Sequence, residues 1–244
     1  MNDRVVSVGS KLRIRSGQTL PHPSAVIFDL DGTLVDTVRT RIEAWHRALK
    51  EGAIPVVEAY LATLIGSDGK FLARNVAEAA GLNLTDDQAE VIDRRSGEIY
   101  EVLNLDPRPL PFAKDLLASL DARNIRWAIA TSSRREQASA SVNALALARP
   151  PQIIDASHVA QAKPAPDLLL HAARALNTPP SRCWYLGDST WDMRAAVSAR
   201  MVAIGVTSGS AVGIRELTIA GATIVCDTLW DVISILSEST TREP

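Results

Sequence analysis

The chain has 244 residues, of which 46% are hydrophobic and 22% charged, and its formal net charge is −2. This composition is typical of a globular protein, and the length suits one large domain or a domain with a substantial insertion. The near-neutral charge argues against nucleic-acid binding, and no apolar stretch approaches the roughly 18 residues that cross a bilayer. The two cysteines, Cys183 and Cys226, are too few for a disulfide scaffold, so we expect a protein of the reducing cytoplasm.

The first 23 residues contain four basic residues but lack the apolar stretch of a secretory signal. We expect a flexible extension over residues 1–23 and assign no fold to it. A basic arm that contacts an anionic partner is the alternative interpretation of this segment.

Short aliphatic runs alternate with segments of helical periodicity along the rest of the chain. Nearly continuous apolar runs are typical of strands that are covered on both faces. Their alternation with helices predicts a doubly wound parallel α/β sheet. The expected strands are 25–28, 126–130, 183–186, 201–206 and 223–226.

A long interval separates the first two expected strands, and its periodicity is helical. Expected helices lie at 39–52, 70–81 and 85–104, with Gly52 and Gly81 as stop signals and Thr85 as an N-cap. Asp36 suits the N-cap of the first of these helices. The prolines of DPRPLP (106–111) predict a hinge back to the sheet. We therefore predict a helical cap over 38–107 inserted into a core domain of 24–37 and 108–240.

Polar residues follow the ends of the expected strands, which is where open parallel sheets bind ligands. The first strand leads into DLDGT, the second into TSS and the third into GDSTWD. A hard divalent cation such as Mg²⁺ prefers carboxylate oxygens and would relieve repulsion among Asp29, Asp31 and Asp188. The sequence therefore predicts a metal site at this edge of the sheet.

The same edge offers groups that suit a phosphoryl ligand. Gly32 permits a sharp turn that brings backbone N–H groups near an anion. Thr131 offers a hydroxyl and Ser132 a backbone N–H, and Lys163 in KPAPD supplies a positive charge. Because residues two apart on a strand face the same side, Asp29 and Asp31 could both face one phosphoryl group.

The motifs DLDGTLVDT, AIATSS, AKPAPD and GDSTWD occur in this order and resemble the four motifs of the haloacid dehalogenase (HAD) superfamily of phosphohydrolases. The resemblance covers about residues 25–226. The insertion after the first motif resembles the helical cap of subfamily I members, such as phosphoglycolate phosphatases and β-phosphoglucomutases. The resemblance implies a Rossmann-like core, Mg²⁺ dependence and hydrolysis of a small phosphorylated metabolite through an aspartyl-phosphate.

The resemblance also implies roles for individual residues. Asp29 would be the nucleophile and touch the metal, whereas Asp31 would be the general acid and base, with its backbone carbonyl on the metal. Dehalogenases proper lack an acid at the position of Asp31, so this residue favours phosphate chemistry. The remaining core roles are phosphate binding by Thr131 and Lys163, metal binding by Asp188 and an auxiliary role for Asp192.

In the cap, GSDGK (66–70) resembles a loop that lies over the active site in relatives. Lys70 is a candidate substrate contact, with a solvated helix face as the alternative, and Arg41 on the first cap helix is a second candidate. The position of Arg41 is typically a histidine in β-phosphoglucomutases, which weakens the alternative of a phosphomutase. A third possibility is a non-catalytic binding or regulatory protein on the same scaffold, and we expect a monomer or a homodimer.

A local departure from the family pattern concerns the end of the helix after the fourth motif. Relatives often have a glycine in an AGM-like stretch there, whereas this chain has SARM, with Arg200 in the place of the glycine. If that position requires a positive φ, Arg200 costs on the order of 1 kcal/mol of stability.

Overall fold

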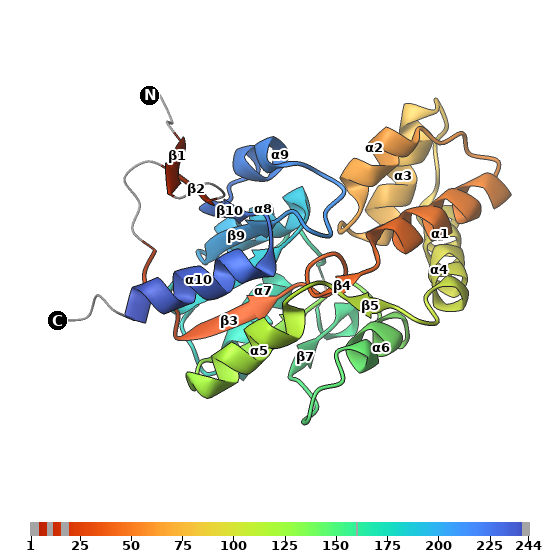
Figure 1. Ribbon diagram of the computed structural model, residues 1–244. Helices are drawn as coiled ribbons and strands as arrows, with labels where there is room; N and C mark the ends of the chain where they lie inside the picture. The colour runs from red at the N-terminus through yellow and green to blue at the C-terminus, as the bar shows by residue number, and fades with distance from the viewer. Residues whose placement is uncertain (1–4, 9–11, 16–19, 160, 241–244) are drawn as a thin grey trace.

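The computed structural model describes residues 5–8, 12–15, 20–159 and 161–240 (Figure 1). Its centre is an eight-stranded sheet with the order β1-β2-β10-β9-β8-β3-β6-β7. Six of these strands are parallel, as predicted for a doubly wound fold. They are β3 (Ala25–Phe28), β6 (Arg126–Ala130), β7 (Ile153–Ile154), β8 (Cys183–Gly187), β9 (Val202–Val206) and β10 (Ile224–Cys226).

The strand order places a switch point beside β3. From β3 the chain builds outward through β6 and β7, and it then returns to the other side of β3 to add β8, β9 and β10. In open parallel sheets such a reversal opens a crevice at the carboxyl ends of the two neighbouring strands. The residues that follow β3 and β8 therefore meet there.

Two short strands lie in the segment for which the sequence predicted a flexible extension. They are β1 (Val5–Val8) and β2 (Leu12–Arg15), which pair antiparallel, and β2 continues the sheet beside β10. Residues 1–4, 9–11 and 16–19 of this segment lie outside the described residues.

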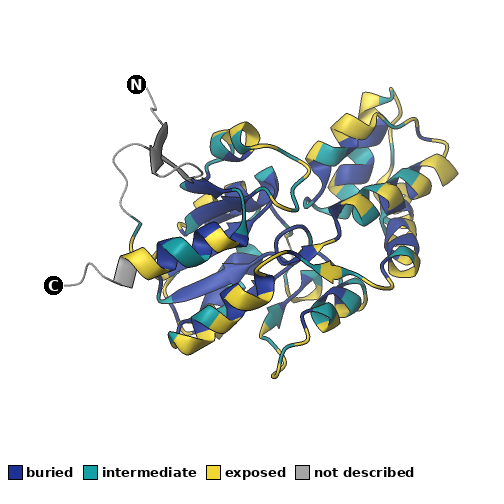
Figure 2. Cartoon of the chain, viewed as in Figure 1, coloured by how far each residue is buried: buried dark blue, intermediate teal, exposed yellow. Residues whose placement is uncertain are grey.

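Helices cover both faces of the sheet because successive strand side chains point to opposite sides. Val26 and Phe28 pack with α5 (Ala113–Ala122), α6 (Arg135–Ala144) and α10 (Leu229–Thr240). Ala25 and Ile27 pack against α7 (Asp167–Ala175), α8 (Thr190–Ser198) and α9 (Ile214–Ile219). Figure 2 shows the central strands buried between these layers. The predicted class, a doubly wound parallel α/β sheet, is confirmed.

Four helices between β4 (Val35–Asp36) and β5 (Arg108–Pro109) form a separate group at one end of the molecule (Figure 1). They are α1 (Val38–Glu51), α2 (Glu58–Leu64), α3 (Gly69–Ala79) and α4 (Asp86–Leu103). These helices bury an apolar cluster of their own, with Trp45, Leu72 and Tyr100 among its members. Residues 38–107, which contain these four helices, are the proposed cap, and we call them the cap below.

The two connections between core and cap run side by side as the antiparallel pair β4–β5. This pairing overturns the prediction that Asp36 caps the first cap helix. Asp36 is exposed and lies opposite Arg108 in β4, and the N-cap position of α1 belongs to Thr37. Within the described residues, no helix is both long and apolar enough to span a bilayer.

Candidate active site

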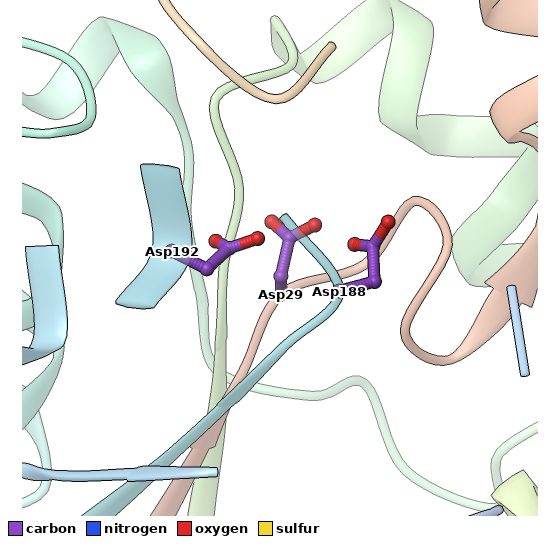
Figure 3. A group of neighbouring side chains, drawn as sticks. All are labelled: Asp29, Asp188 and Asp192. Carbon is purple, nitrogen blue, oxygen red and sulfur yellow. The ribbon is translucent and has the colours of Figure 1, made fainter. Parts of the chain in front are cut away.

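Three buried carboxylates meet at the switch point of the sheet (Figure 3). Asp29 directly follows β3, Asp188 directly follows β8, and Asp192 lies in the first turn of α8. One oxygen from each side chain lies within 4.8 Å of the other two. The arrangement follows from the sheet, because β3 and β8 are parallel neighbours whose carboxyl ends coincide.

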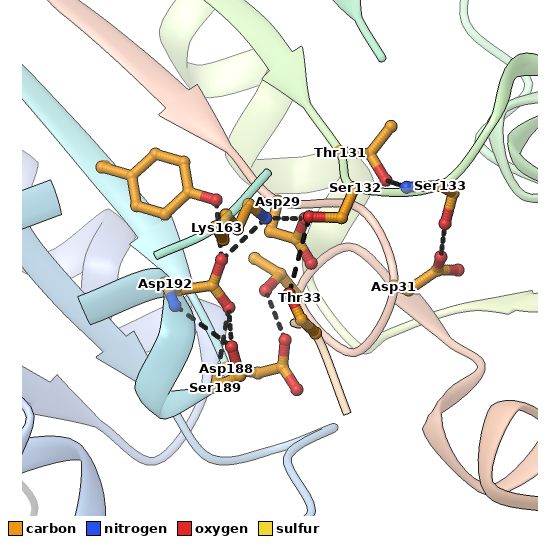
Figure 4. Close-up of polar contacts among 12 residues, drawn as sticks. Asp29, Asp31, Thr33, Thr131, Ser132, Ser133, Lys163, Asp188, Ser189 and Asp192 are labelled. Atoms are coloured by element: carbon orange, nitrogen blue, oxygen red, sulfur yellow. Dashed lines mark hydrogen bonds and ion pairs between the residues drawn. The ribbon is translucent and has the colours of Figure 1, made fainter. Parts of the chain in front are cut away.

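Lys163 neutralises part of this negative charge (Figure 4). Its ammonium donates to Asp29 Oδ1 at 2.5 Å and pairs with Asp192 Oδ1 at 2.8 Å, and its side chain is 1% exposed. Asp192 is also held by the Tyr185 hydroxyl and by the backbone N–H and hydroxyl of Ser189. The predicted lysine thus binds the predicted nucleophile, and Asp192 fixes the lysine.

The charge balance of the cluster fits a divalent cation. Three carboxylates face one ammonium among the described residues, and their oxygens are the hard donors that Mg²⁺ prefers. Burial, partly offset by Lys163 and reinforced by Asp192, raises the pKa of Asp29 to about 7. Burial and the neighbouring Asp192 and Asp29 raise the pKa of Asp188 well above its usual range. A bound cation would reverse both effects because it favours the ionised carboxylates.

Gly32 lets the loop after β3 approach Asp188. Its φ is +80°, and a Cβ at this position would lie 2.4 Å from Asp188 Oδ2 and 2.6 Å from Val38 Cγ2. A side chain would therefore both strain the backbone and displace the carboxylate. Thr33 in the same turn donates to Asp188 Oδ1 at 3.2 Å.

Asp31 faces the cap and not the three-carboxylate cluster. Its Oδ1 accepts from Thr37 at 2.7 Å and Tyr100 at 2.9 Å, and its Oδ2 accepts from Ser133 at 2.7 Å and Arg41 at 2.8 Å. Burial alone would raise the pKa of this carboxyl, but Arg41 and the hydroxyl donors outweigh it and lower the pKa. The metal contact that the family resemblance implies for Asp31 is its backbone carbonyl. This prediction does not depend on the orientation of the Asp31 side chain.

The end of β6 supplies a polar wall of the cleft, apart from the three-carboxylate cluster. Thr131 is buried and accepts from the backbone N–H of Ser133 at 3.0 Å. Both residues, together with Ser132, line the cleft between core and cap. Ser132 donates to the carbonyl of Gly66 in the cap loop at 3.5 Å.

The two predicted cap contacts have different positions. Arg41 lines the cleft, stacks 3.3 Å above the centre of the Tyr100 ring and donates to Gln137 of the core at 3.2 Å. Lys70 does not line the cleft, and its ammonium lies 3.6 Å from Glu90 on α4. Of the loop GSDGK, Gly66, Ser67 and Gly69 reach the cleft.

Contacts across the cleft hold the cap against the core. Arg134 at the start of α6 pairs with Glu90 and Asp93 of α4, each at 3.0 Å. On the other side, the indole of Trp191 donates to the carbonyl of Thr63 and lies edge-on to the ring of Phe71. The free volume left between the walls of the cleft is about 80 Å³.

Sequence reasoning missed most of the partners of Asp31. Thr37 lies within the first motif, and Ser133 is the last residue of TSS, so their proximity to the predicted site was a usable signal. Tyr100 lies in an ordinary amphipathic helix far along the chain, and no motif marks it.

Comparisons with known proteins identify the family and the fold. The sequence model of the haloacid dehalogenase-like hydrolase family matches residues 23–200. The phosphoglycolate phosphatase of Rhodospirillum rubrum is 30% identical, over 77% of this chain and 80% of its own length. The β-phosphoglucomutase of Bacillus subtilis is 31% identical, over 76% of this chain and 84% of its own length. The crystal structure of a hydrolase from Pseudomonas syringae superposes with a TM-score of 0.83 and 36% identity, covering 88% of this chain and 98% of that one.

The chain belongs to the haloacid dehalogenase-like hydrolase family. This confirms the resemblance on which the sequence-based roles rest. The phosphoglycolate phosphatase relative and the hydrolase family support the predicted class of enzyme, a phosphatase.

Proposed function

We propose that this protein is a Mg²⁺-dependent phosphatase that hydrolyses a small phosphorylated metabolite through an aspartyl-phosphate (acyl phosphate) intermediate on Asp29. The observation that carries the proposal is the contact of Asp29 with Lys163 inside a buried three-carboxylate cluster at the sheet's switch point. Asp29 and Asp188, with the backbone carbonyl of Asp31, would hold the metal. The metal would neutralise charge on the transferring phosphoryl group.

The residues of the site suit the two chemical steps. In the first, an Asp29 oxygen bonds to phosphorus, the ester P–O bond breaks, and Asp31 gives its proton to the leaving oxygen. In the second, Asp31 takes a proton from water, the water oxygen bonds to phosphorus, and the bond from phosphorus to Asp29 breaks. Lys163 and Thr131 would hold the phosphoryl oxygens in both steps.

The cleft supports a small substrate. The cap and core are joined by Arg134, Trp191 and Arg41, and only about 80 Å³ remains between them. A larger substrate requires the cap to move outward, and a closed cap excludes bulk water from the phosphoryl site. Polar groups of Arg41, Ser67 and Asp93 line the cap side and suit hydroxyl or carboxylate groups of the substrate.

A phosphate-release screen tests the proposal. Purified protein is assayed with p-nitrophenyl phosphate, sugar phosphates, phosphoglycolate and nucleotides, with and without Mg²⁺. We expect Mg²⁺-dependent release of phosphate from at least one of them, and a loss of about 10³-fold or more in Asp29→Asn. Absence of release across the panel with Mg²⁺ would contradict the proposal.

A phosphomutase is the second candidate, and the Bacillus subtilis relative is the observation in its favour. Incubation with a β-hexose 1-phosphate separates the two functions. A mutase forms the 6-phosphate without net release of phosphate, whereas a phosphatase releases phosphate. Arg41 at the position of the mutase histidine favours the phosphatase, since an arginine does not give up a proton at neutral pH.

A further inference from the structure

A second cavity lies on the far side of α6 from the cleft. It has a volume of about 570 Å³, which falls within the range of small-molecule sites in proteins. None of Asp29, Asp31, Lys163 and Asp188 lines it. The cavity is therefore separate from the site described above.

One stripe of α6 forms a wall of this cavity. The residues that line it recur at intervals of three and four, the spacing of neighbours on one helix face. They are Arg135, Ala138, Ser139, Val142 and Asn143, followed by Ala146 just beyond the helix. The opposite wall is formed by the start of β7 at the edge of the sheet and the segment before it, and it includes Arg149, Gln152 and Ile153.

The chemistry of the lining suits an organic anion. Arg135 and Arg149 both border the cavity, and the guanidinium group of neither makes an ion pair or hydrogen bond with any described residue. The one carboxylate of the lining, Asp155, is buried and already accepts from the backbone N–H and hydroxyl of Ser157. Val142, Leu147 and Ile153 give the cavity an apolar portion. Guanidinium groups without a partner bind carboxylate, sulfonate or phosphate oxygens in a bidentate manner.

The other face of α6 contacts the cap and the cleft. Arg134 pairs with Glu90 and Asp93 of α4, and Gln137 accepts from Arg41. Asn104, where the cap returns to the core, donates to Ser141 at 3.2 Å. Figure 1 shows α6 lying between β7 and α4. A ligand in the cavity would therefore press on the helix that holds the cap.

We propose that the cavity between α6 and β7 is a second binding site, for a small organic anion with an apolar body, and that α6 passes its occupancy to the cap. A shift of α6 changes the contacts of Arg134 and Gln137 together, because Arg134 is the N-cap of the helix and Gln137 lies in its first turn. The site needs no reaction of its own, and its ligand differs from the substrate by binding without Mg²⁺.

Binding of 8-anilinonaphthalene-1-sulfonate to the native full chain tests the site. This probe carries one sulfonate on an apolar body and becomes fluorescent when bound. We expect saturable binding without Mg²⁺, and an affinity weakened about tenfold or more in the double variant Arg135→Ala/Arg149→Ala. Ser139→Trp, which places an indole in the cavity, is expected to weaken it as strongly.

Matched variants distinguish binding in the cavity from binding elsewhere on the protein. Arg215→Ala removes an exposed arginine of α9 outside the cavity and is expected to leave the affinity within about twofold, since no described contact links it to the site. The residues changed on the cavity wall, Arg135, Ser139 and Arg149, are exposed, so a thermal melt should show native folding. Absent binding, or equal affinity of the double variant and the native chain, would overturn the site. If Arg41→Met weakens probe binding and the double variant does not, the probe binds in the cleft, and this result would also overturn the proposed site.

Hydrogen exchange tests the link to the cap. With saturating probe, we expect altered protection of backbone amides in α4 and α1 of the native chain and no change in the double variant. Bound probe with unchanged exchange in both helices would overturn the role of α6.

Discussion

Arg41 on the first cap helix lies 2.8 Å from Asp31 at the edge of the core, so the proposed general acid is tied directly to the cap. Each oxygen of Asp31 accepts two hydrogen bonds, and the donors come from both sides of the cleft. A general acid must instead offer a proton to the leaving oxygen. We infer that substrate binding has to loosen this pair, and that a substrate group which takes over the hydrogen bonds of Arg41 does so.

Replacing Arg41 by methionine tests this inference. Arg41 is the largest influence that lowers the pKa of Asp31, so its loss raises that pKa. The first chemical step needs protonated Asp31, and its rate therefore falls as the pH rises through this pKa. We expect the falling limb of the kcat profile to move to higher pH in Arg41→Met.

Arg39→Met is the matched control, because Arg39 is exposed on the same helix and does not line the cleft. Its profile should coincide with that of the native protein. If the falling limb of the kcat profile stays at the same pH in Arg41→Met, the ion pair with Arg41 does not set the pKa of Asp31.

Lys163 is expected to be essential for stability as well as for phosphate binding. Replacing it by methionine leaves Asp29 and Asp192 buried without their shared ammonium. Loss of one partner of a buried ion pair costs about 3–5 kcal/mol. We expect Lys163→Met to lower the free energy of unfolding by this amount, measured by urea unfolding with EDTA at about pH 8. Mg²⁺ should restore part of the lost stability.

Lys70→Met provides the comparison for this measurement. Its ammonium is 3.6 Å from Glu90 and nearly half exposed, so the pair contributes at most about 1 kcal/mol. Equal destabilisation by the two substitutions would contradict the assignment of Lys163 as the buried counter-ion of the cluster.

The stabilisation by Mg²⁺ should depend on pH. The pKa of Asp29 is about 7 in the folded protein and near 3.8 when the chain is unfolded. Between these values the unfolded chain releases a proton that the folded protein retains, so the metal-free protein loses stability as the pH rises through this window. Above about pH 7 the loss is complete and constant.

Mg²⁺ binds the ionised carboxylate and competes with this proton. We therefore expect Mg²⁺ to raise Tm clearly at about pH 8 and little at about pH 5, measured against EDTA at each pH. In Asp29→Asn the difference between the two pH values should shrink. A Tm increase independent of pH would contradict binding at Asp29.

The features predicted from sequence are those encoded locally. Aliphatic runs such as 25–28 and 183–186 mark buried strands, and the residues that follow them converge because all strands of a parallel sheet end at one edge. The cluster of Asp29, Asp188 and Lys163 could be anticipated in this way.

The features missed depend on neighbours distant in sequence. The strand β7 has two residues and exists because it pairs with β6, and α2 has seven residues, too few for a clear periodicity. Asp36 has the residue type of an N-cap, but pairing of β4 with β5 extends the chain at that point. The orientation of Asp31 toward the cap depends on Tyr100 and Ser133, which lie 69 and 102 residues away in the chain.

Arg200 offers a prediction that is independent of catalysis. It follows the end of α8 with a φ of +59°, and the next residue, Met201, donates its N–H back to the carbonyl of Ala196. This left-handed conformation costs an L-residue roughly 1–2 kcal/mol, whereas glycine adopts it freely but loses more entropy on folding. We expect Arg200→Gly to stabilise the protein by about 0.5–1 kcal/mol in urea unfolding, with activity unchanged.

Arg200→Ala separates the backbone effect from loss of the charged side chain. Alanine keeps the Cβ that causes the strain, so its free energy of unfolding should stay close to that of the native protein. Because Arg200 is exposed and makes no ion pair with any described residue, its charge should contribute little. Equal gains from alanine and glycine would show that the side chain, and not the positive φ, is the source of the cost.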